Sequence, residues 1–335
     1  VFIDSDLDFS DELSKKFSPI GKDSDCNFQG VFNGQGYRIN GLAITSSNLK
    51  YVGLFGYSRG AEIKCIVMDK TSSVTVTGVN SPSIGPDTYI GNIIGHCDIF
   101  SRCVIESDVS EASIRYDEPS NDNNLHIGGI VGSLSFRELF SFKNCVNRGN
   151  ITYSGSVNRL HIGGLIGSSN SRTSTEFSVM NSINFGTIHV DGSTDNSFIF
   201  VGGIVGNSEY GTFVNCVSAG RITMNLLGYA GAFVGSATNS VFENSYFDKN
   251  TYSRQFGTSK TCLAKEVSSF DGVTFKLEKE VAAKNYTGDS LLDALNAVSD
   301  YYYIRGYSHW LLVRGSSKVS FVIKGRKKNL STLSH

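Results

Sequence analysis

Acidic side chains are the residues in this sequence whose chemistry could serve hydrolysis or calcium binding. Glycoside hydrolysis needs two carboxyl groups on one face, and Ca²⁺ needs several oxygen ligands in one place. Asp4, Asp6 and Asp8 alternate and would share one strand face, which is typical of a solvated strand. Because no repeated acidic face is evident, we predict that the chain is not an enzyme. The acids of the early repeats stand at positions that are not equivalent between repeats: Asp69, Asp87, Asp98, Glu106, Asp108 and Glu111.

Histidine, basic and glycine-rich motifs give no stronger signal for a cofactor or a metal. No serine nucleophile elbow, zinc-protease motif or phosphate-binding loop stands in a strand-to-helix context, and the glycines of residues 31–41 precede no helical pattern. His126 and His161 share a repeated position, but a transition metal takes three or four ligands. The basic run at 325–330 is typical of a solvated tail. We expect no cofactor and no metal.

Cysteine usage favours a structural role. The seven cysteines form no CxxC pair, which argues against a disulfide framework and a zinc ribbon. We predict that four of them share one repeated position, where serine takes their place in two other repeats, and that this position forms a column of small side chains inside the fold. The sequence leaves open whether any pair forms a disulfide. The residues of this column are Cys65, Cys103, Cys145, Ser182, Cys216 and Ser245.

Composition excludes some classes of partner. The 335 residues carry 30 basic and 31 acidic side chains, so no overall positive field attracts nucleic acid. No run of about 18 apolar residues is present, so we expect no direct membrane insertion. Glycine is abundant, at 36 residues, and charged residues are scarce, at 18%, which favours turns and closely packed backbone over long helices.

One glycine motif recurs six times. The final glycines of its copies lie 39, 37, 35, 39 and 29 residues apart, a spacing typical of stacked repeats. A second run of β-branched and aromatic residues follows each copy, which indicates strands separated by turns. The six copies are YVGLFG (51–56), YIGNIIG (89–95), HIGGIVG (126–132), HIGGLIG (161–167), FVGGIVG (200–206) and YAGAFVG (229–235).

A repeat of this length must stack on its neighbours to bury an apolar face, because it cannot do so alone. In-register stacking would place equivalent residues in columns about 4.8 Å apart. We predict that Ile127, Ile162 and Val201 form one inward apolar column. The residue that opens each motif has a planar ring, so the same stacking predicts a ring column that either stabilises the stack or binds a partner. These six residues are Tyr51, Tyr89, His126, His161, Phe200 and Tyr229.

The chain resembles the GLUG-motif repeat proteins. The resemblance rests on Pro19-Ile20-Gly21, on the glycine and aromatic pattern of residues 28–42, with Asn33 in the place of the usual Asp, and on the six repeats. It implies an all-β parallel β-helix, or β-solenoid, and an adhesin-like or cell-surface role. We expect the solenoid to be right-handed, as most parallel crossovers are.

Three segments follow from these patterns. We predict a solenoid of about six repeats plus an entry unit over residues 1–248, a connector over 249–285 and a small α+β C-terminal module over 286–335 that caps the stack. In this module, residues 290–299 have helical spacing, and Trp310–Arg314 and Val319–Lys324 have the composition of strands.

The sequence therefore predicts a non-enzymatic structural or binding segment of a larger extracellular or cell-surface protein, which recognises a protein or a glycan on another surface or neighbouring segments of an assembly. The ring column is its candidate binding site. A carbohydrate-active β-helix enzyme and a purely architectural spacer are the alternatives. We expect the enzyme to show a cluster of acids on one face of the solenoid.

Overall fold

The computed structural model describes most of the chain up to Phe270 and two short strands beyond it. The described residues are 1–11, 17–77, 87–99, 103–106, 108–118, 124–136, 140–171, 177–192, 198–248, 252, 256–260, 263–264, 267–270, 310–312 and 319–321.

The described residues form a parallel β-solenoid whose strands stack into five parallel sheets, here called A to E. Each full coil passes through the sheets in the order E, C, A, B and D. Sheet E contains β5 (Tyr51–Val52), β10 (Asp87–Gly91), β15 (Asn124–Gly128), β20 (Arg159–Gly163), β25 (Ile199–Gly202) and β30 (Tyr229–Gly231). Sheet C contains β6 (Phe55–Arg59), β11 (Ile94–Ile99), β16 (Val131–Phe136), β21 (Ile166–Ser171), β26 (Val205–Glu209), β31 (Val234–Thr238) and β34 (Phe256–Lys260).

Sheets A, B and D complete each coil. Sheet A contains β2 (Val31–Asn33), β7 (Glu62–Lys64), β12 (Cys103–Glu106), β17 (Phe140–Lys143), β22 (Phe177–Met180), β27 (Gly211–Val214), β32 (Val241–Glu243) and β35 (Leu263–Ala264). Sheet B contains β1 (Leu7–Asp8), β3 (Arg38–Asn40), β8 (Val67–Met68), β13 (Val109–Ser110), β18 (Val146–Asn147), β23 (Ile183–Asn184), β28 (Val217–Ser218), β33 (Ser245–Asp248) and β36 (Val267–Phe270). Sheet D contains β4 (Ala43–Ser46), β9 (Ser73–Thr77), β14 (Ser113–Glu118), β19 (Ile151–Gly155), β24 (Ile188–Gly192) and β29 (Ile222–Met224).

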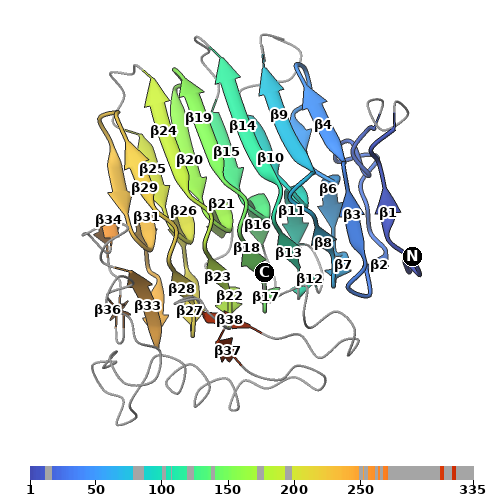
Figure 1. The fold of residues 1–335 in the computed structure, drawn as a ribbon. Helices are drawn as coiled ribbons and strands as arrows, with labels where there is room; N and C mark the ends of the chain where they lie inside the picture. The colour runs from blue at the N-terminus through green and yellow to red at the C-terminus, as the bar shows by residue number, and fades with distance from the viewer. Residues whose placement is uncertain are drawn as a thin grey trace.

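Figure 1 shows the strands of successive coils side by side, from β1 and β3 in blue to β31 and β33 in orange. The stack does not stop at residue 248, because β34, β35 and β36 pair in parallel with β31, β32 and β33. Near the C-terminus, β37 (Trp310–Leu312) and β38 (Val319–Phe321) form an antiparallel pair. The helix predicted at 290–299 lies outside the described residues.

The core of the solenoid is built from columns of aliphatic side chains. Ile127 pairs with Ile162, and Ile162 pairs with Val201, in strict register along sheet E. All three side chains are fully buried in the apolar core. This confirms the predicted inward column and shows why the position before each glycine is β-branched in these repeats, since such side chains pack well on a pleated surface.

Asparagine makes the corner between sheets A and B in four successive coils. Each of these asparagines has a positive φ, between 44° and 59°, a conformation that asparagine adopts more readily than most residues. Their side-chain amides also bond along the stack, at 3.3, 2.7 and 3.1 Å from nitrogen to oxygen. The corner therefore joins neighbouring coils as well as turning the chain. The four residues are Asn144, Asn181, Asn215 and Asn244.

A buried asparagine of sheet B, Asn184, explains why one position of the repeated motif, Gly164, is glycine. The buried amide of Asn184 donates to the carbonyl oxygen of Gly186, at 3.1 Å, and accepts from the amide nitrogen of Gly186, at 3.0 Å. A Cβ atom at Gly164 would lie 2.2 Å from the Asn184 amide nitrogen and 2.1 Å from the carbonyl oxygen of Gly203. This coil therefore needs glycine at position 164, because Asn184 of sheet B approaches it across the core, whereas the equivalent positions of two other coils hold Asn92 and Ala232.

Candidate functional site

The structure brings the six predicted ring residues into one column on sheet E. Consecutive members are paired residues of neighbouring strands all the way from β5 to β30. The column therefore follows from strand register, as the sequence predicted. Its members are Tyr51, Tyr89, His126, His161, Phe200 and Tyr229.

The rings of this column touch their neighbours. Tyr51 stacks on Tyr89 with centroids 5.4 Å apart and planes 5° apart, and Tyr89 stacks on His126 at 4.9 Å and 17°. His126 meets His161 edge-on at 4.8 Å. Phe200 lies 5.4 Å from His161 and stacks on Tyr229 at 5.7 Å. Such contacts contribute about 0.5–1.5 kcal/mol each, so the column stabilises the stack whatever else it does.

The rings lie on the outer face of sheet E. Strand residues alternate between faces, and the residues on either side of His126, Leu125 and Ile127, both lie in the apolar core. His126 and His161 are nevertheless only 7% and 8% exposed, whereas Tyr229 at the end of the column is 41% exposed. The column is therefore covered in its middle and open at its C-terminal end.

Sequence reasoning missed a group of rings on sheet C that faces the start of the column. The centroid of Tyr57 lies 4.9 Å from that of Tyr51, and the centroid of His96 lies 4.8 Å from that of Tyr89. Tyr57 donates its hydroxyl to Asp98 at 3.0 Å, and burial followed by the charge of Asp98 raises the pKa of Tyr57 to about 12. The signal was present in the sequence, because both rings directly follow the last glycine of their motif.

The two adjacent histidines of the column are held neutral. Their Nδ1 atoms lie 3.2 Å apart, so one ring donates to the other. Burial, followed by the nearby His96 and Arg159, lowers the pKa of His126 from 6.5 to about 3. Burial, followed by His126 and Arg159, also lowers the pKa of His161 well below its ordinary value. Among the described residues, no group of three or more histidines, cysteines or acids is arranged to hold a metal ion.

These histidines should make the stack sensitive to acid. Because the folded-state pKa of His126 lies below its unfolded value, its stabilisation is complete above about pH 6.5 and is lost as the pH falls toward about 3. Moving from pH 7.5 to pH 5.5 should cost about 1 kcal/mol from His126 alone. Replacing both histidines with phenylalanine, the residue at position 200, should flatten this dependence. Urea unfolding at the two pH values measures it, and an equal loss in parent and variant would show that the histidines are not its source.

An exposed apolar patch adjoins the open end of the ring column. Phe198 stands two residues before Phe200, so it lies on the same outer face of sheet E. Leu227 stands in the bend before β30, next to Gly228, where a Cβ atom would lie 2.8 Å from the Cβ atom of Ile199. Phe198 is 46% exposed and Leu227 is 78% exposed. The guanidinium group of Arg159 lies over the Phe198 ring, 4.9 Å from its centroid. We call Phe198, Leu227 and Tyr229, together with Arg159, the sheet E patch.

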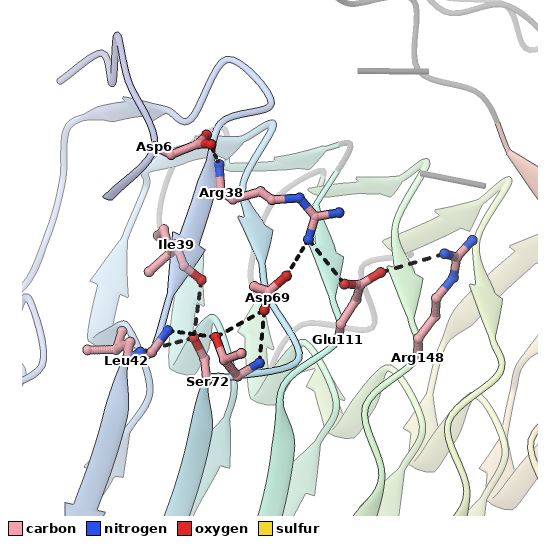
Figure 2. A network of polar contacts seen from close by, with 10 residues as sticks. Asp6, Arg38, Ile39, Leu42, Asp69, Ser72, Glu111 and Arg148 are labelled. Atoms are coloured by element: carbon pink, nitrogen blue, oxygen red, sulfur yellow. Dashed lines mark hydrogen bonds and ion pairs between the residues drawn. The ribbon is translucent and has the colours of Figure 1, made fainter. Parts of the chain in front are cut away.

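Two of the acids form a charge network along sheet B (Figure 2). The prediction that the acids are not equivalent is wrong for Asp69 and Glu111. Each is the next residue after one member of the register pair formed by Met68 and Ser110. Arg38 binds both carboxylates, and the second oxygen of Glu111 lies 3.6 Å from Arg148. Burial opposes ionisation of Asp69, but hydrogen bonds from Thr71 and contact with Arg38 outweigh it and lower the pKa of Asp69. Thr71 and Arg38 therefore favour the ionised form of Asp69, and Glu111 is bridged between Arg38 and Arg148.

The predicted cysteine column is correct for the later coils and wrong for two residues. Cys145 and Cys216 are buried, and their backbone N–H groups donate to the hydroxyls of Ser182 and Ser245 in the following coils, both at 3.2 Å. Cys103, however, pairs with Phe140.

The position assigned to Cys103 belongs to Asp108, whose carboxyl accepts from Ile66 at 2.9 Å. Full burial raises the pKa of Asp108 well above its ordinary range. Cys65, with φ of 56°, occupies the corner position that Asn144 fills two coils later. The error arose because the segment between the two motifs differs in length from coil to coil.

Comparisons with known proteins identify no family for this chain. No family model matches the sequence, and no curated protein matches it. Among solved structures, the chain is similar to the crystal structure of a "putative immunoglobulin A1 protease" from Bacteroides ovatus, with 13% sequence identity and a TM-score of 0.47. The match covers 96% of this chain and 84% of that one. In the described part of the chain, no helix is long and apolar enough to span a membrane.

Proposed function

We propose that this chain is a non-enzymatic structural and binding segment of a larger cell-surface or secreted protein, an adhesin-like rod of GLUG-type repeats. The repeated motif occupies equivalent positions in successive coils, which supports the repeat assignment. The columns of isoleucines, asparagines and rings are used to hold the coils together, which suits a rigid support.

The observation that carries the binding role is the sheet E patch. Leu227 is 78% exposed, and its chain neighbour Gly228 lies against Ile199, which directly follows the exposed Phe198. Apolar groups of this size rarely gather on a surface without a partner. Aromatic residues with an arginine are the composition of binding hot spots between proteins, and an aliphatic Leu offers no flat face to a sugar. The partner that fits is therefore another protein, with an apolar surface that the patch can cover.

The acidic residues argue against a carbohydrate-active enzyme, and the sheet E patch argues against a purely architectural spacer. A carbohydrate-active enzyme needs a carboxyl pair in which at least one group can donate a proton to a bound sugar. Asp69 and Glu111 are paired with arginines, and Asp108, whose pKa is raised, is fully buried. A purely architectural spacer has no use for exposed apolar rings. Both observations favour the binding segment.

The test uses the double variant Phe198→Ser, Leu227→Ser. Labelled parent chain should bind saturably to a panel of cultured epithelial cells, and the double variant should bind at least roughly tenfold more weakly, because the hot-spot side chains are gone. Val31→Ser is the matched control, since Val31 is 40% exposed and lies in β2 of sheet A, near the N-terminus. It should bind like the parent, and circular dichroism should show all three chains folded.

Treating the cells identifies the class of partner. Protease treatment should abolish binding, while periodate oxidation of surface sugars should leave it. The reverse pattern would identify a glycan and would contradict the protein partner. If the parent chain showed no saturable binding, the binding role would be contradicted and the architectural spacer would be supported. Release of reducing ends from a panel of polysaccharides would establish the enzyme instead.

A further inference from the structure

Two cysteines of one coil face each other inside the core. Cys97 lies in β11 of sheet C and Cys103 lies in β12 of sheet A, on the two sides of one corner. Their Sγ atoms are 3.2 Å apart, and both residues are buried in the apolar core, with at most 1% exposure. A disulfide bond has a length of about 2.05 Å, so a shift of little more than 1 Å would join the two sulfurs.

Packing alone does not require two thiols at this corner. In the preceding coil, the equivalent positions hold Ser58 and Ala61. In the following coil they hold Leu134 and Phe140. Side chains of very different size and polarity therefore fill the same corner, and the shared geometry is what brings the two positions together. Because cysteine occupies both positions, this coil can form a disulfide at the corner, which the preceding and following coils cannot.

The other buried cysteines make different contacts. The thiols of Cys145 and Cys216 approach backbone carbonyl oxygens of Lys143 and Val214 at 3.3 and 3.4 Å. Contact with Cys97, followed by burial, raises the pKa of the Cys103 thiol. A thiol of this kind reacts slowly once the chain has folded, because the thiolate is the nucleophile. Oxidation would therefore take place during folding, and the finished bond would be shielded from reductants.

We propose that Cys97 and Cys103 form a disulfide that closes the corner between sheets C and A. The oxidant is a small disulfide such as oxidised glutathione. One cysteine thiolate attacks it, forming a mixed disulfide and releasing one glutathione thiolate. The second cysteine thiolate attacks the protein sulfur of that mixed disulfide and releases the other glutathione. Two protein S–H bonds are lost and one S–S bond forms, while the two electrons and the two protons end on two molecules of glutathione.

This inference does not depend on the binding role of the sheet E patch. A bond that closes so short a loop stabilises the coil by restricting the unfolded chain. The oxidised protein should therefore melt roughly 3–5 °C above the same protein kept in dithiothreitol.

The sequence allows a direct test by peptide mapping. Arg102 lies between the two cysteines, so trypsin separates residues 71–102, which contain only Cys97, from residues 103–115, which contain only Cys103. The full chain is refolded from urea in a buffer of reduced and oxidised glutathione, quenched in acid, alkylated and digested. We expect the two peptides to be recovered as one linked species about 2 Da lighter than their sum, which separates when dithiothreitol is added.

The fold is followed by circular dichroism in the same samples. Cys145→Ala is the matched control, because it removes a buried thiol outside the pair and should leave the linked species unchanged. Recovery of both peptides as separate alkylated species from correctly folded chain would overturn the proposal. Linkage of either peptide to a different cysteine would overturn it as well.

Discussion

Replacing Ile162 with Asp is expected to lower the free energy of unfolding by about 4–6 kcal/mol, because it removes a large core side chain and buries a carboxylate with no partner. Ile162 is fully buried between Ile127 and Val201 of the adjacent coils. The carboxylate would therefore be surrounded by aliphatic side chains of three coils. Urea unfolding followed by circular dichroism measures the effect.

The matched control is Arg159→Asp, which introduces the same carboxylate in the same strand. Arg159 is exposed, so its variant should unfold close to the parent, within about 1 kcal/mol. A variant of Ile162 that melted like the parent would mean that this position faces outward and that the register of sheet E is wrong.

Replacing Asn181 with Val is expected to cost about 3–4 kcal/mol, for two separate reasons. At φ of 48°, a β-branched residue is strained by roughly 1–3 kcal/mol. The Asn181 amide also donates to Asn144 and accepts from Asn215, and losing it leaves buried partners unsatisfied, at about 1–3 kcal/mol.

Asn181→Gly separates the two causes. Glycine accepts a positive φ without strain, so this variant should lose only the amide contacts and should fall between the parent and the Val variant in urea unfolding. Equal stability of the Gly and Val variants would show that φ contributes nothing at this corner. Equal stability of the Gly variant and the parent would show that the asparagine ladder contributes nothing.

The sequence predicted the register of sheet E well, for a physical reason. The motif that crosses from sheet E to sheet C is packed so closely that Gly163 can carry no side chain, and glycine occupies the equivalent position in all six copies. Columns anchored to the motif, such as Ile127 with Ile162 and the ring column, were therefore predicted correctly.

Residues away from the motif could not be placed as reliably. The segments between the motif and sheet A vary in length, so counting from the motif put Cys103 in the column that Asp108 occupies. The same variation hid the equivalence of Asp69 and Glu111. Asparagine precedes both Cys145 and Cys216 in the repeats, but its role depends on a positive φ, which the amino-acid sequence does not show.

Exposure along the ring column was also beyond the sequence. The middle rings are covered while Tyr229 is open, and this difference depends on the surroundings of each ring rather than on ring type. Tyr57 and His96 illustrate the point, because they come from another sheet and meet the column only after the chain turns. The coil formed by β34, β35 and β36 likewise carries no recognisable motif, although it pairs in register.

The central claim, parallel in-register stacking of the coils, can be measured directly on the outer face of sheet D. Thr45, Thr75, Arg115, Thr152, His189 and Thr223 are paired one after another along this face. With Cys26, Cys65 and Cys262 replaced by Ser, spin labels are attached through cysteines introduced at Thr45 and at either His189 or Thr223, and the distances are read by pulsed electron paramagnetic resonance. At about 4.8 Å per coil, in-register stacking gives backbone separations near 19 Å over four coils and near 24 Å over five. A regular increase from the first pair to the second would support it, whereas distances that do not grow with the number of coils would contradict it.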